Sequence, residues 1–250
     1  MIQPVALVTG SGKERVGNAV ARDLASHGYR IAIHYFRSAQ AADETVADLT
    51  RQKVEAAAFR ADLRKEDDVI RLVERTKAHF GRLDVLVCAA AVWQRKSLEA
   101  TTAADLQDQW EANALSTFLC VKHAGLVMVT QPEGGAIVTI GDWAIARPYR
   151  DYAAYFPSKG AIPTMTRDLA VELGERNPHV RVNCILPGPV MLPPDLPAEE
   201  RKEAIDATLV KREGTPRNVA HAVRFLIEND FITGVCLPVD GGRSIYARGL

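Results

Sequence analysis

Short runs of β-branched residues alternate with amphipathic stretches along almost the whole chain, and this alternation limits the possible folds more than any other feature. Two runs, 85–87 and 137–138, are apolar on both faces, as expected of strands that helices cover on two sides. Strands are predicted at Val5–Thr9, Arg30–Tyr35, Val54–Ala61, Leu83–Cys88, Ala136–Ile140, Val180–Ile185 and Val235–Val239. Helices are predicted between them, including Asn18–His27, Asp67–Phe80 and Ala104–Val129.

Such alternation predicts an α/β fold, a doubly wound parallel sheet of about seven strands and of Rossmann type. A chain of 250 residues is long enough to bury one substantial core. No repeat or linker interrupts the pattern, so residues 1–250 are expected to form a single domain. The proline-rich stretch from Pro187 and the charged segment after it are expected to form a lid over a site, at about 187–212.

Charge and composition exclude several classes of partner. Lys plus Arg equals Asp plus Glu, at 31 each, so nothing points to nucleic acid or an anionic membrane. No leader-like N-terminus and no spanning apolar run is present, so we expect a cytoplasmic protein. The 4 cysteines are far apart and are expected to be reduced and buried, and the 6 histidines lack the spacing of metal ligands. We therefore expect no metal.

A glycine-rich turn follows the first predicted strand and opens a helix. Glycines at such a turn let the backbone approach a pyrophosphate, which the N–H groups at the helix start then bind. Lys13 and Arg15 add positive charge where the phosphates would lie. The alternatives are a merely tight turn and two solvated loop cations.

The end of the second strand indicates which dinucleotide is bound. A NAD-selective fold places an acid here for the ribose 2′-hydroxyl, but the first acid after His34 is Asp43. Arg37 and Ser38 instead offer a guanidinium fork and a hydroxyl for a 2′-phosphate, which predicts NADP(H). The alternative is a surface arginine after a strand. Asp62, after the third strand, is placed either to contact adenine or to cap a helix.

A possible catalytic group lies further along the chain. Tyr155 and Lys159 are four residues apart, which on a helix places both side chains on one face. An ammonium group near a phenol favours the phenolate, so we expect Lys159 to lower the pKa of Tyr155. Asp142 follows the fifth predicted strand; its carboxylate can accept hydrogen bonds from ring N–H groups or stabilise a protonated imine. It therefore favours a C=N substrate, and the alternative is that Asp142 caps a turn or pairs with Lys159.

Several motifs together resemble the short-chain dehydrogenases/reductases over essentially the whole chain. They are Thr9-Gly10, Asp62-Leu63, Asn113, Tyr155-x-x-x-Lys159, Pro187-Gly188 and Val239-Asp240-Gly241-Gly242. Within that family the chain most resembles the pteridine reductases and dihydromonapterin reductases. The residues that carry this closer resemblance are Arg15, His34 to Ser38, Trp93, Asp142 and Tyr152.

The resemblance implies a role for each matching residue. It implies hydride transfer from NADPH to a pterin-type ring, with Asp142, Tyr155, Lys159 and Asn113 as catalytic residues and Asn113 linking Lys159 to solvent through water. Implied cofactor contacts are Gly10, Lys13, Arg15, Val16, Gly17, His34, Tyr35, Phe36, Arg37, Ser38, Asp62, Leu63, Ala89, Ala90, Ala91, Tyr155, Lys159, Pro187 and Gly188. Implied substrate contacts are Arg15, Trp93, Asp142, Tyr152 and Tyr155, with Trp93 stacking on the pterin. Family members are usually tetramers or dimers, and the tail 243–250 is expected to reach a neighbouring subunit.

The chain also departs from the family pattern. Cys88 to Ala91 replaces the usual Asn-Asn-Ala-Gly, so contacts there are expected from the backbone alone. Pro157 is tolerable if the helix starts near Ala154, whereas Pro163 is expected to kink it. Two alternatives stay open: a reductase of a sugar or acyl ketone with Asp142 incidental, and a sensor that binds NADP(H) without turnover.

Overall fold

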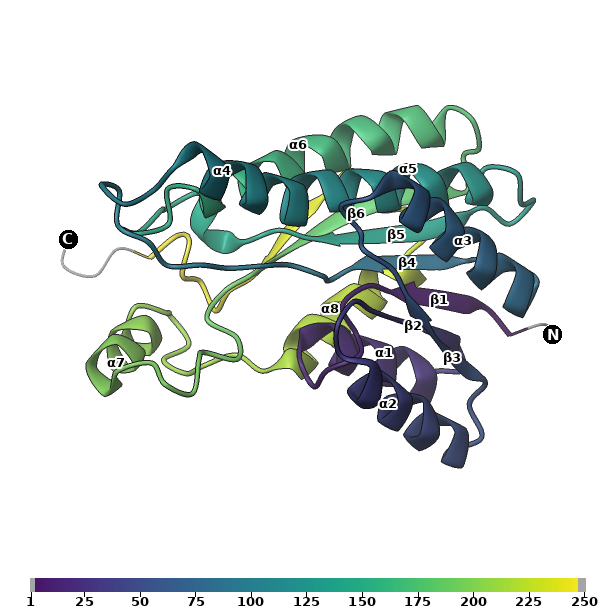
Figure 1. The fold of residues 1–250 in the computed structure, drawn as a ribbon, viewed down its shortest axis with the longest axis horizontal. Helices are drawn as coiled ribbons and strands as arrows, with labels where there is room; N and C mark the ends of the chain where they lie inside the picture. The colour runs from purple at the N-terminus through teal and green to yellow at the C-terminus, as the bar shows by residue number, and fades with distance from the viewer. Residues whose placement is uncertain (1–2, 247–250) are drawn as a thin grey trace.

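The computed structural model describes residues 3–246, and a parallel sheet forms its middle layer (Figure 1). The strand order is β3-β2-β1-β4-β5-β6-β7. The strands are β1 (Val5–Val8), β2 (Arg30–Tyr35), β3 (Ala56–Arg60), β4 (Val85–Cys88), β5 (Gly135–Ile140), β6 (Val180–Pro187) and β7 (Cys236–Val239). The order reverses between β1 and β4, which is the switch point where doubly wound sheets bind ligands.

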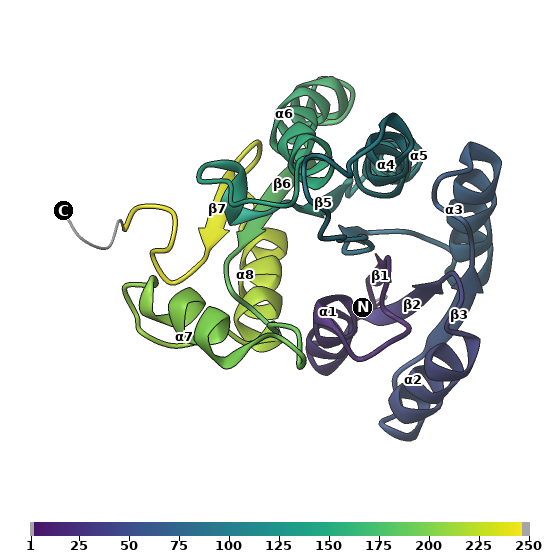
Figure 2. The same cartoon turned by 60° about the vertical axis from the view of Figure 1, so that its left-hand side comes forward.

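Helices cover both faces of the sheet (Figure 2). One face carries α1 (Val16–Ser26), α2 (Ala39–Arg51) and α8 (Pro216–Glu228), and the other carries α3 (Glu66–Phe80), α5 (Ser116–Met128) and α6 (Tyr155–Gly174). Successive β4 residues face opposite layers, since Val85 and Val87 join the core under α1 and α8 whereas Leu86 joins the core under α3 and α5. The predicted doubly wound, single-domain fold is confirmed.

Several observed elements differ from the predicted ones in their bounds, and one predicted helix is divided. The helix expected at Ala104–Val129 is divided into α4 (Ala103–Gln109), a π-helical turn (Trp110–Leu115) and α5. Such π-turns occur often at functional sites. The third strand is shorter than predicted: residues 54–55 and 61 lie outside β3.

The structure also shows the character of the helices and the state of the cysteines. No helix within residues 3–246 is long and apolar enough to cross a membrane. All four cysteines are free thiols; Cys88, Cys120 and Cys184 are buried and Cys236 is partly buried. Of the predicted tail, residues 247–250 lie outside the described residues.

Candidate active site

The glycine-rich turn is shaped by close backbone contacts. Gly10 has φ +63°, and a Cβ there would lie 2.8 Å from the Cα atom of Ala90. A Cβ at Gly17 would lie 2.9 Å from the carbonyl oxygen of Gly10. The side chain of Arg15 does not cap α1, so the N–H groups at the helix start are left for a ligand. This turn fits the pyrophosphate of a dinucleotide, and Lys13, Arg15 and Val16 remain at least partly exposed around it.

His34 holds this turn in place from the end of β2. Its Nδ1 atom accepts a hydrogen bond from the N–H of Gly10 at 3.0 Å, and its Nε2 atom lies 3.2 Å from the carbonyl oxygen of Ala61. The ring is buried, and burial lowers its pKa to about 4. Because both ring nitrogens are engaged inside the protein, His34 positions the turn; its expected contact with a cofactor stays a prediction.

Thr9 fixes the unusual segment after β4. Its Oγ1 atom accepts hydrogen bonds from the N–H groups of Ala89 and Ala90 at 3.0 and 3.1 Å. The backbone of this segment is thus held from β1 although the usual amide side chains are missing. Sequence reasoning missed Thr9 as a positioning residue, because its partners lie 80 and 81 positions away.

The segment after β2 lies beside the glycine turn. A Cβ at Gly12 would lie 3.1 Å from the Oγ atom of Ser38 and 3.1 Å from the Cβ atom of Tyr35. Ser38 precedes α2 and makes no capping bond, which leaves its hydroxyl available. Arg37 is exposed and stacks its guanidinium 5.1 Å from the ring of Phe36. Ser38 therefore lies next to the glycine-rich turn, and the predicted binding of a phosphate by Arg37 and Ser38 stays a prediction.

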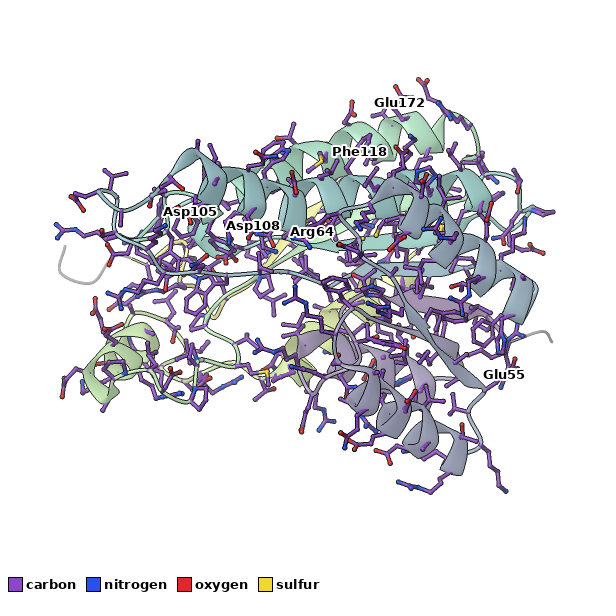
Figure 3. The ribbon with its side chains drawn as sticks, in the orientation of Figure 1. Glu55, Arg64, Asp105, Asp108, Phe118 and Glu172 are labelled. Carbon is purple, nitrogen blue, oxygen red and sulfur yellow. The ribbon has the colours of Figure 1, made fainter. Side chains whose placement is uncertain are left out.

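Asp62 is paired with an arginine at the end of β3. Its Oδ1 atom accepts from Nε of Arg64 at 3.1 Å, and Arg64 also approaches Asp108 at 3.4 Å (Figure 3). Burial raises the pKa of Asp62, but the bonds from Arg64 outweigh burial and leave it below its ordinary value. Lys65 is the residue that precedes α3, so the alternative that Asp62 caps this helix is wrong. Its neighbour Leu63 is buried.

The central contact of the site joins Asp142 and Tyr155. The Tyr155 hydroxyl donates to Oδ2 of Asp142 at 2.8 Å, while Oδ1 of Asp142 accepts from the N–H of Ala144 at 2.8 Å. Asp142 thus caps the 3-10 turn Trp143–Ile145 and also binds the phenol. Burial raises the pKa of Asp142, although the bonds from Ala144 and Tyr155 oppose the shift.

Tyr155 and Lys159 lie in the first two turns of α6, as predicted. The hydrogen bond of Lys159 and the pKa of Tyr155 differ from what was expected. Nζ of Lys159 donates to the carbonyl oxygen of Ile140 at 2.9 Å rather than to Asp142. Burial lowers the pKa of Lys159, with Asp142 opposing. Burial and the charge of Asp142 raise the pKa of Tyr155 well above its ordinary value, so the predicted lowering is wrong for this structure. Tyr155 is accordingly a protonated donor here.

The two prolines of α6 leave this spacing intact. Pro157 lies in the first turn, where a missing N–H breaks no helical bond, and the helix begins at Tyr155 as expected. Pro163 lies inside the helix, which continues to Gly174.

Asn113 lies in the π-helical turn and is fully buried. Its Oδ1 atom accepts from the N–H of Val92 at 2.9 Å, and its Nδ2 atom donates to the carbonyl oxygen of Val92 at 3.1 Å and to Oγ of Ser158 at 3.0 Å. The side chain therefore fixes the segment that carries Trp93 and connects it to α6. The predicted water link to Lys159 remains a proposal.

Aromatic rings cluster around Tyr155, with the Tyr152 ring 6.3 Å and the Phe156 ring 5.4 Å from it. Trp93 stacks on Tyr152 with centroids 5.0 Å apart and planes 14° apart, and it remains 47% exposed. The alternative that Trp93 is core filler is wrong, since this exposure leaves ring surface available. Tyr149 packs edge-on against both Tyr152 and Phe156 at 5.0 Å. Phe156 was not predicted for the site, although its place next to Tyr155 could have indicated it.

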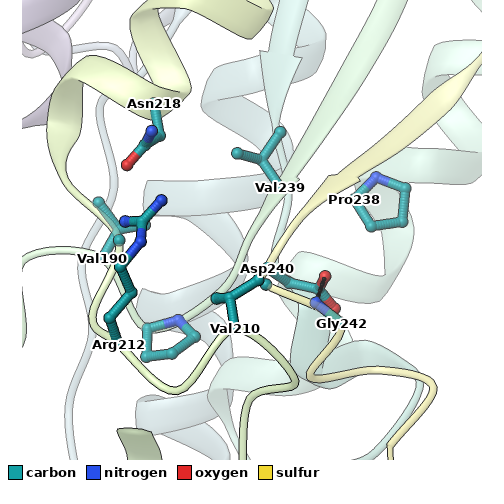
Figure 4. A pocket seen from close by; sticks show the side chains of 11 residues that line it. Val190, Val210, Arg212, Asn218, Pro238, Val239, Asp240 and Gly242 are labelled. Carbon is teal, nitrogen blue, oxygen red and sulfur yellow. Dashed lines mark hydrogen bonds between the residues drawn. The ribbon is translucent and has the colours of Figure 1, made fainter.

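The predicted lid contains α7 (Ala198–Asp206), which has no buried residue. Pro187 ends β6, and a Cβ at Gly188 would lie 2.4 Å from the Cα atom of Asp240. A cavity of about 300 Å³ lies where the lid returns to α8, lined by Val190, Arg212, Asn218 and neighbours (Figure 4). None of the predicted catalytic residues lines it. Arg95, which the sequence did not single out, pairs with Asp151 at 3.2 Å and with Glu200 of α7 at 3.4 Å.

Comparison with known proteins agrees with this geometry. The family model described as enoyl-(acyl carrier protein) reductase matches residues 11–244. Human 3-oxoacyl-(acyl-carrier-protein) reductase is 35% identical over 92% of this chain and 94% of its own. The Synechocystis protein of the same name is 32% identical over 97% of both chains. A dehydrogenase/reductase structure from Sinorhizobium meliloti has a TM-score of 0.89 at 30% identity, covering 97% of this chain and 96% of its own.

Proposed function

The chain belongs to the short-chain dehydrogenase/reductase family, and from this premise we propose that it is an NADPH-dependent reductase of a pterin-type ring C=N bond. The observation that carries the proposal is the 2.8 Å hydrogen bond from Tyr155 to a carboxylate, Asp142. A hydroxyl at position 142 could donate to a carbonyl oxygen, whereas a carboxylate accepts from ring N–H and amino groups. This chemistry favours a nitrogen heterocycle over a plain ketone.

The chain's own residues account for the proton in such a reduction. When bound, NADPH supplies the hydride. Burial and Asp142 keep Tyr155 protonated, and burial raises the pKa of Asp142 toward the range in which a carboxyl group can carry a proton. Lys159 lies on the same helix face, and its ammonium can stabilise negative charge that develops when the phenol gives up its proton. Trp93 offers a flat face on which the ring can stack.

Preference for NADPH is proposed from the segment after β2. Arg37 and the uncapped hydroxyl of Ser38 lie where no acid competes for the ribose. A preference for NADH of tenfold or more in kcat/KM would contradict this part of the proposal.

An NADPH-oxidation assay with a small substrate panel tests the proposed reaction. Wild-type protein is expected to reduce dihydrobiopterin or dihydrofolate with kcat/KM at least about 100-fold above that for a 3-oxoacyl thioester. Asp142→Ser is expected to abolish pterin reduction, and thermal unfolding checks that this variant folds. Full pterin activity in Asp142→Ser would refute the role of Asp142.

Carbonyl reduction is the second candidate, because the human and Synechocystis relatives are named 3-oxoacyl reductases. Turnover of the thioester alone would support it. The third alternative is a sensor that binds NADP(H) without turnover, and tight cofactor binding without turnover of any substrate in the panel would favour it.

We further propose that the protein forms a homodimer or homotetramer. Leu106, Trp110, Phe118 and Val171 are apolar side chains exposed by 36% to 61% on α4, the π-turn, α5 and α6. A second copy covering them would remove apolar surface from water. Light scattering is expected to give the mass of two or four chains, and a monomer at micromolar concentration would contradict this proposal.

A further inference from the structure

Two arginines from distant parts of the chain meet beside the substrate end of the site. The segment after β7 leaves the sheet on the side of α7 (Figures 1 and 2). Arg147 donates to the carbonyl oxygen of Arg243 at 3.4 Å and also to that of Tyr246. The guanidinium of Arg243 lies 5.0 Å from the centroid of the Trp143 ring. Trp143 directly follows Asp142, so this pair lies close to the carboxylate that binds Tyr155.

Neither of the two guanidinium groups has a carboxylate partner among residues 3–246. Within residues 3–246, no carboxylate oxygen lies within 4.0 Å of either group, whereas Arg95 and Arg201 have carboxylate partners at 3.2 and 2.7 Å. Burial and the charge of Arg147 lower the pKa of Arg243, and Glu203 of α7 opposes this shift. Arg243 is partly buried and Arg147 is exposed, and two nearby positive charges without a carboxylate partner favour the binding of an anion.

A series of aromatic ring contacts connects this pair to the proposed ring site. The Tyr149 ring lies 6.4 Å from Trp143, on which Arg243 stacks. On its other side Tyr149 lies 5.0 Å from Tyr152, the ring that carries Trp93. A ligand whose flat ring lies near Tyr155 can therefore extend a tail along Tyr149 to the arginines.

We propose that Arg147 and Arg243 form an anion-binding subsite for a carboxylate on the tail of the substrate. The proposal rests on the proposed function for the identity of the ring, but not for the recognition of the charge. Guanidinium forks match carboxylate geometry, and Trp143 holds one of them in place. The site thus selects a substrate with a flat ring at one end and a carboxylate at the other.

Steady-state kinetics with a charged and an uncharged tail test this subsite. In Arg243→Gln and Arg147→Gln, KM for dihydrofolate is expected to rise about tenfold, while KM for dihydrobiopterin changes less than about twofold. Arg243→Lys is expected to recover part of the loss. Arg150→Gln is the matched control, since it removes one positive charge from the same loop and is expected to leave both KM values within about twofold. An equal effect of all variants on both substrates would overturn the proposal.

A binding measurement separates failure of the subsite from failure of the proposed function. Folate, which carries the same carboxylates, is titrated into wild-type and variant protein in the presence of NADP⁺, with tryptophan fluorescence as the signal. Weaker folate binding in Arg243→Gln without pterin turnover in wild-type protein would support the subsite and refute the proposed function. Undetectable folate binding to wild-type protein, or equal binding to wild-type and Arg243→Gln protein, would refute the subsite whatever the turnover.

Discussion

The two ends of the candidate site are built differently, although both lie at the carboxyl edge of one sheet. At the nucleotide end, buried side chains bind backbone groups: His34 binds Gly10, and Thr9 binds Ala89 and Ala90. At the substrate end, exposed ion pairs and aromatic contacts join loops to the lid, as Arg95 does with Asp151 and Glu200. Buried bonds are costly to break and exposed ion pairs are not. The first end is therefore fixed in shape, and the second can adapt to its ligand.

Tyr155 lies where the two ends meet, and its loss is expected to have the largest effect. Tyr155→Phe removes the donated proton and keeps the ring, so kcat is expected to fall about 10³-fold, or about 4 kcal/mol, with little change in cofactor affinity. Stopped-flow measurement of NADPH oxidation gives kcat, and fluorescence titration gives the affinity. A large loss of NADPH affinity would show that the two ends are not separable here.

Replacing His34 tests how far the stability of the nucleotide end depends on one buried imidazole ring. The folded protein keeps this ring neutral down to about pH 4, whereas the unfolded chain protonates it near pH 6.5. The unfolded state therefore binds more protons in this window, and stability is lost as pH falls from 6.5 to 4, by up to about 3 kcal/mol.

His34→Asn keeps an acceptor for Gly10 and removes the titration, so its stability should depend less on pH in this window. Urea unfolding at pH 7 and pH 4.5 measures the difference, with His27→Asn, at the exposed C-terminal end of α1, as a control. Identical pH dependence of wild type and His34→Asn would contradict the assignment.

Arg37 tests whether the fixed end also selects the cofactor. Arg37→Ala is expected to lower kcat/KM for NADPH about thirtyfold and to leave that for NADH within about threefold, because only a 2′-phosphate uses the guanidinium. Initial rates with both cofactors give the two ratios. Equal losses with both would indicate that Arg37 acts through the shape of the segment instead.

Arg95 tests the adaptable end, with the smallest expected effect. Arg95→Gln removes both ion pairs to Asp151 and Glu200, and KM for substrate is expected to rise about twofold at low salt and less at high salt, because exposed pairs are weak and screened. KM is compared at about 0.05 and 0.5 M NaCl, with Arg71→Gln on α3 as the control. A tenfold change would show that the lid is held more firmly than its exposed contacts indicate.

Features that depend on local spacing could be predicted from the sequence, whereas features that depend on residues far away in the chain could not. The glycine turn and the Tyr155–Lys159 spacing are local, and both were found. The direction of the Tyr155 pKa was predicted wrongly, because it depends on burial and on Asp142, 13 positions away. Thr9 was missed for the same reason, since its partners come from another strand. Arg95 belongs to no sequence motif, and its ion pairs with Asp151 and Glu200 depend on tertiary contacts between segments far apart in the chain.

The two ends of the predicted lid lie side by side in space. Val190 pairs with Gly214 in an isolated bridge, and the N–H of Gly214 donates to the carbonyl oxygen of Pro189 at 3.0 Å. A segment whose two ends are held together can change in length at small entropic cost, because the entropy lost on closing a loop grows only slowly with its length. Leu209 is a further attachment point, since its N–H donates to the carbonyl oxygen of Gly241 at 2.8 Å. A relative's segment that replaces residues 191–213 and keeps this bond is expected to alter the substrate range of the scaffold without rebuilding its nucleotide end.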